Sequence, residues 1–84
     1  PLAGKHRMRL STRPKDPGYA AFKAIPSRLI ADVFLDGQRI ERVITADDRL
    51  GYVLASAGYL NAKGTDFLYK QHYGDVRIQL IPRA

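Results

Sequence analysis

The chain has 84 residues, a net charge of +6 and no cysteine. This length fits one domain with a compact core and little room for a deep internal pocket. Hydrophobic residues make up 45% and charged residues 26%, a balance typical of a folded protein. The lack of cysteine excludes disulfides, thiolate metal sites and thiol nucleophiles. We therefore expect residues 1–84 to form a single domain, and the sequence leaves open whether residues 1–5 are ordered.

The positive charge is concentrated in the first third of the chain. Up to Arg28 there are seven basic residues and one acidic residue, Asp16, whereas from Leu29 onward seven basic residues face seven acidic ones. Such an asymmetry indicates a basic arm or face. No apolar stretch approaches the roughly 18–20 residues that cross a bilayer, and the first four residues lack the apolar core of a signal peptide. Together with the missing disulfides, this predicts a soluble, cytoplasmic protein with no membrane partner.

The first elements alternate between strand and turn signals. Met8 and Leu10 alternate with polar residues, which predicts a strand over Lys5–Ser11. Two prolines and a glycine in Arg13–Gly18 then predict a turn. Tyr19–Ile25 fits one or two helical turns but also a strand or a loop, and Pro26 ends any helix there.

The clearest local signal is Asp36-Gly37, between apolar runs over Arg28–Leu35 and Gln38–Thr45. This dipeptide predicts a β-hairpin, because a type I′ turn requires positive φ at both central residues. A turn is expected next, over Ala46–Arg49.

The second half reads as three more strands. They cover Leu50–Ala55, then Phe67–Tyr73, which Gly74 bends or bulges, and then Val76–Leu80, which Pro82 ends. An exposed tip over Gly58–Gly64 is expected between the first two. The sequence thus predicts a mainly β fold: a small antiparallel sandwich or partly open barrel of about five strands, with at most one short helix near residues 19–25.

No residue pattern points to catalysis, a metal or a cofactor. His72 lies near Asp75 in the sequence, but no nucleophile accompanies the two residues. The carboxylates Asp47 and Asp48, with Asp32 and Asp36, match no cation-binding loop, and adjacent acids in a turn typically accept hydrogen bonds from backbone amides. We therefore expect a protein that is not an enzyme.

Nucleic-acid binding is one of two remaining hypotheses. Basic residues in the first third could form a ladder on the outer face of the first strand, and a basic and aromatic segment near Tyr69 could stack bases. The alternative reading is that the charges keep a strand edge soluble and that the tyrosines pack on the sheet. The residues concerned are Lys5, Arg7, Arg9, Arg13, Lys15, Lys70 and Tyr73. Reversing Arg7 and Arg9 to glutamate should then abolish binding without unfolding the domain.

Protein binding is the other hypothesis. Tyr59, Leu60 and Asn61 lie in the predicted tip, where exposed apolar side chains can mark a partner surface. Tyr59 and Leu60 could equally fold back over the core. A sheet edge is a further candidate surface, and the sequence does not indicate the oligomeric state.

Residues 29–81 carry a resemblance to known proteins. The similar segments are Val33–Gly37, then Ala46–Asp48 with Gly51–Val53, and finally Tyr73–Ile78. In these the chain resembles small uncharacterised proteins of tailed bacteriophages and prophages. The resemblance implies a prophage origin, a phage structural or assembly protein as the partner, and a location in the cytoplasm or on the virion. It supplies no functional residues. The leading hypothesis is therefore a non-enzymatic β-domain for protein interaction or assembly, with nucleic-acid binding as the alternative.

Overall fold

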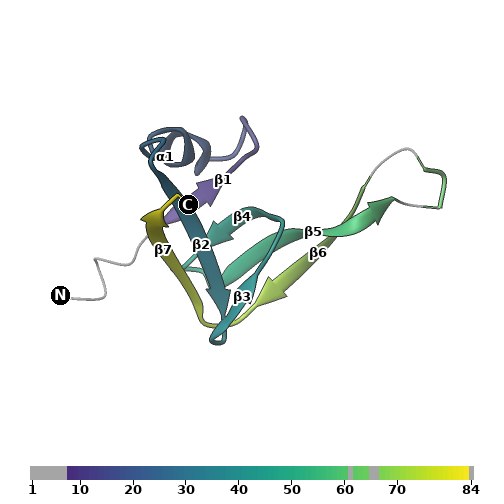
Figure 1. Cartoon of the computed structure of the whole chain (residues 1–84). Coiled ribbons are helices and arrows are strands. Elements are labelled where there is room, and N and C mark those ends of the chain that lie inside the picture. Colours follow the sequence, from purple (N-terminus) through teal and green to yellow (C-terminus); the bar gives the residue numbers. More distant parts are fainter. Residues whose placement is uncertain (1–7, 61, 65–66, 84) are drawn as a thin grey trace.

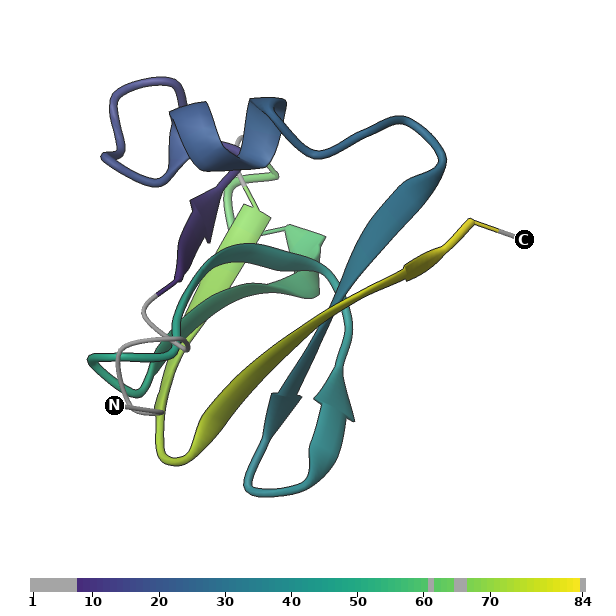
Figure 2. The ribbon, with the colours of Figure 1, turned by 90° about the vertical axis from the view of Figure 1, so that its left-hand side faces the viewer.

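The computed structural model describes residues 8–60, 62–64 and 67–83. This part of the chain forms seven strands and one short helix. They are β1 (Arg9–Ser11), α1 (Tyr19–Lys23), β2 (Leu29–Leu35), β3 (Gln38–Ile40), β4 (Val43–Asp47), β5 (Tyr52–Leu60), β6 (Phe67–Tyr73) and β7 (Val76–Pro82). The strands form two antiparallel sheets, with the orders β1-β4-β5-β6 and β3-β2-β7 (Figures 1 and 2). The predicted mainly β fold with one short helix is confirmed, although seven strands replace the expected five.

The hydrophobic core lies between the two sheets. Its buried residues come from both layers: Val33, Ala46, Val53, Ala55 and Val76. Strand alternation explains this set, because Ala46, Val53 and Ala55 occupy the same face of the four-stranded sheet through the pairs Ala46↔Val53 and Val43↔Ala55. Val53 is completely buried, so the core is centred on β5.

The turn at Asp36-Gly37 forms as predicted. Asp36 has φ 51° and Gly37 has φ 85°, so both central residues have the positive φ of a type I′ turn. Asp36 also anchors the turn before β7: its backbone amide donates to the Asp75 carbonyl, and its Oδ1 accepts from the Asp75 amide, both at 2.9 Å. The two turns are therefore fastened together at one end of the three-stranded sheet.

Two predicted segments differ from the structure. The run Gln38–Thr45 was expected as one strand, but it divides at Glu41–Arg42, where Arg42 has φ 57° and the chain passes from one sheet to the other. The predicted turn over Ala46–Arg49 begins later, because Ala46 and Asp47 still pair with Val53 and Tyr52 in β4–β5. Pairing with the distant strand β1 on one side and with β5 on the other extends β4 past its local turn signal.

The hairpin of β5 and β6 runs away from the rest of the molecule (Figure 1). β5 continues to Leu60, so Gly58 to Leu60, expected in the tip, belong to a strand. At the other end of β6, Gly74 forms a bend into β7. The segment Tyr19–Ile25, for which the sequence left helix, strand and loop open, contains the helix α1, which packs beside β1. Among the described residues, no helix is both long and apolar enough to cross a membrane.

Candidate functional site

Arg9, one of the predicted nucleic-acid-binding residues, is held in an ion-pair network. Its Nη2 lies 2.7 Å from Asp16 Oδ2 and its Nη1 lies 3.2 Å from Asp47 Oδ2. The hydrogen bond from Arg9, supported by one from the Gly18 amide, lowers the pKa of Asp16 to about 2. The same hydrogen bond to Asp16 raises the pKa of Arg9 above its usual range. The Arg9 side chain therefore makes ion pairs within the fold. Its replacement by glutamate would place three carboxylates together.

The outer face of β1 is covered rather than open to solvent. Ser11 Oγ lies 2.8 Å from Thr45 Oγ1, and both side chains are buried. The segment after β1 folds back over this face, with the Ser11 amide donating to the Gly18 carbonyl at 3.2 Å. Gly18 is required there, since an added Cβ would lie 2.8 Å from the Arg9 carbonyl oxygen. The ladder of basic side chains expected along β1 is thus interrupted at Arg9.

The loop after β1 nevertheless brings a basic residue to the hairpin. The Arg13 guanidinium carbon lies 5.3 Å from the centre of the Tyr69 ring on β6, within the range of a cation–π contact. Lys15 in the same loop and Lys70 on β6 are exposed. Of the other predicted residues, Tyr73 ends β6, and Lys5 and Arg7 lie outside the described residues.

β6 forms an open edge of the four-stranded sheet. In the described part of the chain its only strand partner is β5. Six large hydrophobic side chains of the described residues are exposed, and three of them lie on β6. Their exposed fractions are 41% for Leu68, 42% for Tyr69 and 68% for Tyr73. The Tyr73 ring packs against Tyr52 with centroids 5.4 Å apart, and this contact restricts its orientation. The edge therefore offers unpaired backbone groups together with oriented aromatic side chains.

The predicted tip residues are only partly described. Tyr59 and Leu60 are the last two residues of β5. Asn61 lies outside the described residues, so the predicted surface over Tyr59, Leu60 and Asn61 stays a hypothesis. Leu60 pairs with Phe67 across the hairpin, after a register irregularity that follows Ser56.

Three of the four carboxylates considered for metal binding, Asp36, Asp47 and Asp48, accept backbone hydrogen bonds, and the fourth, Asp32, pairs with Arg39. Asp47 Oδ1 accepts from the amides of Arg49 and Leu50, at 2.9 and 2.8 Å, and Asp48 Oδ1 accepts from Met8 at 2.7 Å. The described residues contain no cluster of three or more potential metal ligands. No hydrogen bond joins His72 to Asp75 in this part of the chain, and Asp75 instead pairs with Arg77 at 3.3 Å.

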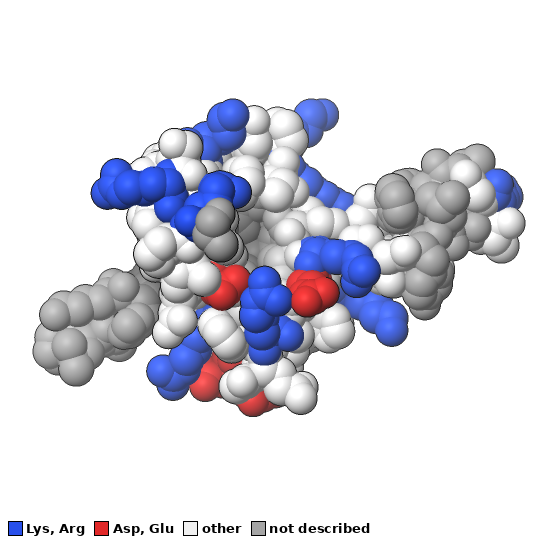
Figure 3. Space-filling model, in the orientation of Figure 1, with Lys and Arg blue, Asp and Glu red and all other residues white. Residues whose placement is uncertain are grey.

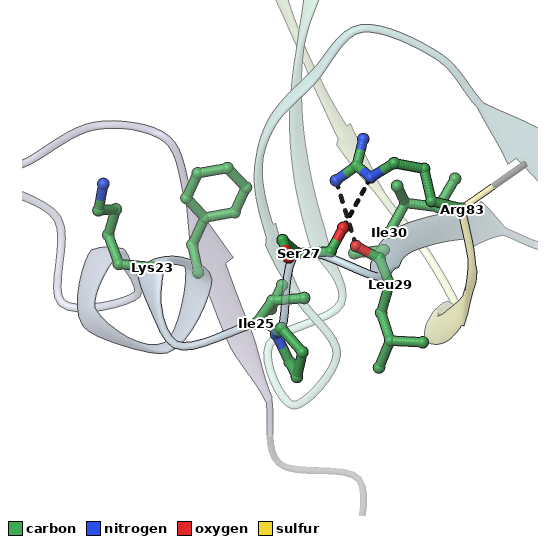
Figure 4. A pocket seen from close by; sticks show the side chains of 9 residues that line it. Lys23, Ile25, Ser27, Leu29, Ile30 and Arg83 are labelled. Atoms are coloured by element: carbon green, nitrogen blue, oxygen red, sulfur yellow. Dashed lines mark hydrogen bonds between the residues drawn. The ribbon is translucent and has the colours of Figure 1, made fainter.

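A groove of about 400 Å³ separates the end of α1 from the start of β2 (Figure 4). The described residues that line it are mostly apolar, with two basic residues and no acidic one. They are Phe22, Lys23, Ile25, Pro26, Ser27, Leu29, Ile30, Ala31 and Arg83. Sequence reasoning missed Arg83, although the antiparallel pairing of β2 with β7 places it next to Arg28: the Arg83 amide donates to the Arg28 carbonyl at 2.8 Å.

The charge is unevenly distributed over the surface. On the face shown in Figure 3, acidic side chains lie in the middle and at the lower end, whereas the upper end around α1 carries basic side chains. Residues 12–28 contribute four basic side chains to that region, and the single acid among them, Asp16, is paired with Arg9. Both the basic loop and the groove therefore favour an anionic partner.

Comparison with known proteins adds no assignment: no protein family matches the chain, and neither a curated protein nor a solved structure is significantly similar to it. Function must therefore be argued from the surfaces described above.

Proposed function

We propose that the chain is a non-enzymatic assembly module that binds another protein through the open edge of β6. The observation that supports this most strongly is the concentration of exposed apolar side chains on one edge strand: Leu68, Tyr69 and Tyr73. An edge strand can accept a strand from a partner, with the backbone groups supplying affinity and the side chains supplying specificity.

The other edges are less suited to strand addition. β1 and β3 have three residues each. β7 has seven residues, but it ends at Pro82, which lacks an amide donor, and Leu80 is its only large hydrophobic residue that is extensively exposed. β6 is equally long and has no proline.

The two tyrosines of β6 suit a partner interface because they are already oriented. Tyr73 packs against Tyr52, and Tyr69 contacts the Arg13 guanidinium, so each ring has a neighbour that restricts its motion. Aromatic anchors that are fixed before binding lose little conformational entropy on association. Lys70, on the opposite face of the strand from the two tyrosines, disfavours the antiparallel register in which two copies of this edge would bring their lysines together. A different protein with an acidic residue opposite Lys70 therefore suits this edge better than a second copy of the chain.

We further propose that this partner is a phage structural or assembly protein, acting in the cytoplasm or on the virion. The support for the partner's identity is the resemblance of residues 29–81 to small phage and prophage proteins. A protein-binding role also needs no catalytic group or cofactor.

Variants on two exposed surfaces can test the edge. The tagged chain is purified from a host that expresses it with its neighbouring genes, and its partner is quantified by mass spectrometry. A double variant Leu68→Lys/Tyr73→Lys should reduce recovery of that partner at least about tenfold, as expected when hot-spot side chains are removed. Leu50→Lys is the control, because Leu50 is 60% exposed but lies in the β4–β5 turn. Equal recovery by both variants would contradict the proposal.

Nucleic-acid binding is a second candidate, supported by the contact of Arg13 with Tyr69. This contact places a basic loop beside exposed aromatic rings, the combination that binds single strands. Fluorescence anisotropy with labelled single- and double-stranded DNA and RNA, at low and physiological salt, tests this. Arg13→Glu/Lys70→Glu should abolish binding that persists at physiological salt, whereas Arg49→Glu should retain most of it. Absence of binding at low salt would eliminate the candidate.

A further inference from the structure

The groove beside α1 combines an apolar floor with a basic rim. Phe22 is 37% exposed, and Ile25 and Leu29 are partly buried beside it. Figure 4 shows Lys23 and Arg83 on opposite sides of the groove, with Ile25 and Leu29 between them. The two walls come from distant parts of the sequence. The antiparallel pairing of β2 with β7 brings Arg83 next to the segment that joins α1 to β2.

Within the described part of the chain, Arg83 is held in place by backbone carbonyl groups and not by a carboxylate side chain. Its Nε donates to the Ser27 carbonyl at 2.9 Å, and its Nη2 donates to the Leu29 carbonyl at 3.3 Å. Within the described residues, Nη1 makes no hydrogen bond. A guanidinium oriented in this way keeps donors for an external acceptor, and a carboxylate is the group that matches its planar geometry.

The surroundings strengthen the preference for an anion. Among the residues that the structure describes, no aspartate or glutamate lines the groove. Arg28, exposed in the turn before β2, adds another positive charge beside Ser27. A ligand for this groove must therefore combine an apolar group with negative charge.

We infer that the groove binds a short acidic segment of a partner protein. An apolar side chain of the segment packs against Phe22, Ile25 and Leu29, and a neighbouring carboxylate accepts hydrogen bonds from Arg83. A peptide fits better than a nucleic acid, because the floor is mostly aliphatic and Phe22 is the one aromatic side chain among its described lining residues, so successive bases have no row of rings on which to stack. The inference concerns a surface other than the β6 edge, so it does not depend on the proposed function.

Titration of the ¹⁵N-labelled protein with a synthetic peptide tests the groove. The probe is an eight-residue peptide with a central leucine and phenylalanine flanked by aspartates and glutamates. We expect amide shift changes confined to residues 22–31 and 83. A second peptide, with asparagine and glutamine in place of the acids, should bind at least about tenfold more weakly, as expected when charge-assisted hydrogen bonds are lost.

Matched variants separate the groove from general electrostatics. Arg83→Gln and Phe22→Ala should each weaken the acidic peptide about tenfold, the first by loss of a charge-assisted contact and the second by loss of an apolar one. Arg49→Gln makes the same charge change in the β4–β5 turn and should leave the affinity within about twofold. Circular dichroism of each variant confirms that the fold persists. Leu68→Lys/Tyr73→Lys should bind the peptide as the wild type does, which separates this site from β6.

Three results with the peptides would overturn the inference. They are no shift changes at millimolar peptide, equal binding of the acidic and amide peptides, and loss of affinity in Arg49→Gln equal to that in Arg83→Gln. A single-stranded oligonucleotide that displaces the acidic peptide from residues 22–31 and binds more tightly would also overturn it, by making the groove a nucleic-acid site.

Discussion

Arg9 and Asp16 are joined by two parallel hydrogen bonds, Nε to Oδ1 at 2.8 Å and Nη2 to Oδ2 at 2.7 Å. This bidentate geometry is the strongest form of an arginine–carboxylate pair. It fastens β1 to the loop that leads into α1, and a third contact, to Asp47, connects the pair to β4. The basic first third of the chain is thus held to the sheet by one of its own arginine side chains, Arg9.

Removal of the Arg9 guanidinium should destabilise the domain. In Arg9→Gln, Asp16 and Asp47 would remain largely buried without their charged donor, so we expect the free energy of unfolding to fall by roughly 2–3 kcal/mol at pH 7. Urea denaturation measures this. Arg77→Gln is the control, because Arg77 and Asp75 form an exposed pair whose loss should change the stability by less than about 0.5 kcal/mol. Similar losses in both variants would contradict the account.

The Arg9–Asp16 pair also predicts the direction of a pH dependence. The pKa of Asp16 is about 2 in the folded protein against an ordinary value of 3.8. The unfolded chain therefore takes up the proton first as the pH falls, so the stabilisation is complete above about pH 4 and is lost toward pH 2. It amounts to about 1–2 kcal/mol once solvent screening is allowed for. The difference in unfolding free energy between wild type and Asp16→Asn should shrink over this range, and a constant difference would refute the assignment.

Gly51 should be intolerant of any side chain. It has φ 68°, and an added Cβ would lie 2.5 Å from the Gly74 carbonyl oxygen, where two turns meet and the Gly74 amide donates to the Gly51 carbonyl. Gly51→Ala should therefore cost more than about 2 kcal/mol. Gly37→Ala is the matched control: Gly37 has φ 85° but no atom within 4 Å of the added Cβ, so only the backbone cost of about 1 kcal/mol applies. Thermal unfolding of the two variants should rank them in this order.

Ser11 and Thr45 should show energetic coupling. Their hydroxyls form a buried hydrogen bond of 2.8 Å, and Ser11 Oγ also accepts from the Arg13 amide. Ser11→Ala and Thr45→Val should each cost about 1–2 kcal/mol, because each leaves a buried polar partner unpaired. The double variant should cost less than the sum by at least about 0.5 kcal/mol. Strict additivity in a double-mutant cycle would show that the hydroxyls do not interact in solution.

Local features of this fold could be predicted from the sequence. The Asp36-Gly37 turn depends on two adjacent residues that tolerate positive φ. The helix over Tyr19–Lys23 ends before Pro26, and the apolar alternation of β7 marks a strand. In each case the structure is determined by neighbours in the sequence, so the signal lies within a few residues.

Features that depend on distant residues could not be predicted in this way. The break at Glu41–Arg42 has no glycine or proline, and it arises because β3 and β4 join different sheets. Arg9 was assigned to an outward basic face, but its partners Asp16 and Asp47 lie seven and 38 residues away. Arg83 reaches the groove only because β7 pairs along the whole of β2. Counting charges located the basic third of the chain. It did not show which of the basic side chains there form ion pairs within the fold.

The most direct test of binding through β6 is site-specific photo-crosslinking in a host that expresses the chain with its neighbouring genes. The photoreactive residue p-benzoylphenylalanine replaces Tyr73 on β6 in one variant and Leu50 in the β4–β5 turn in another, both exposed positions. The account predicts that irradiation joins one defined protein to the Tyr73 position and none to the Leu50 position. Adducts at neither position, or equal adducts at both, would contradict binding through the β6 edge.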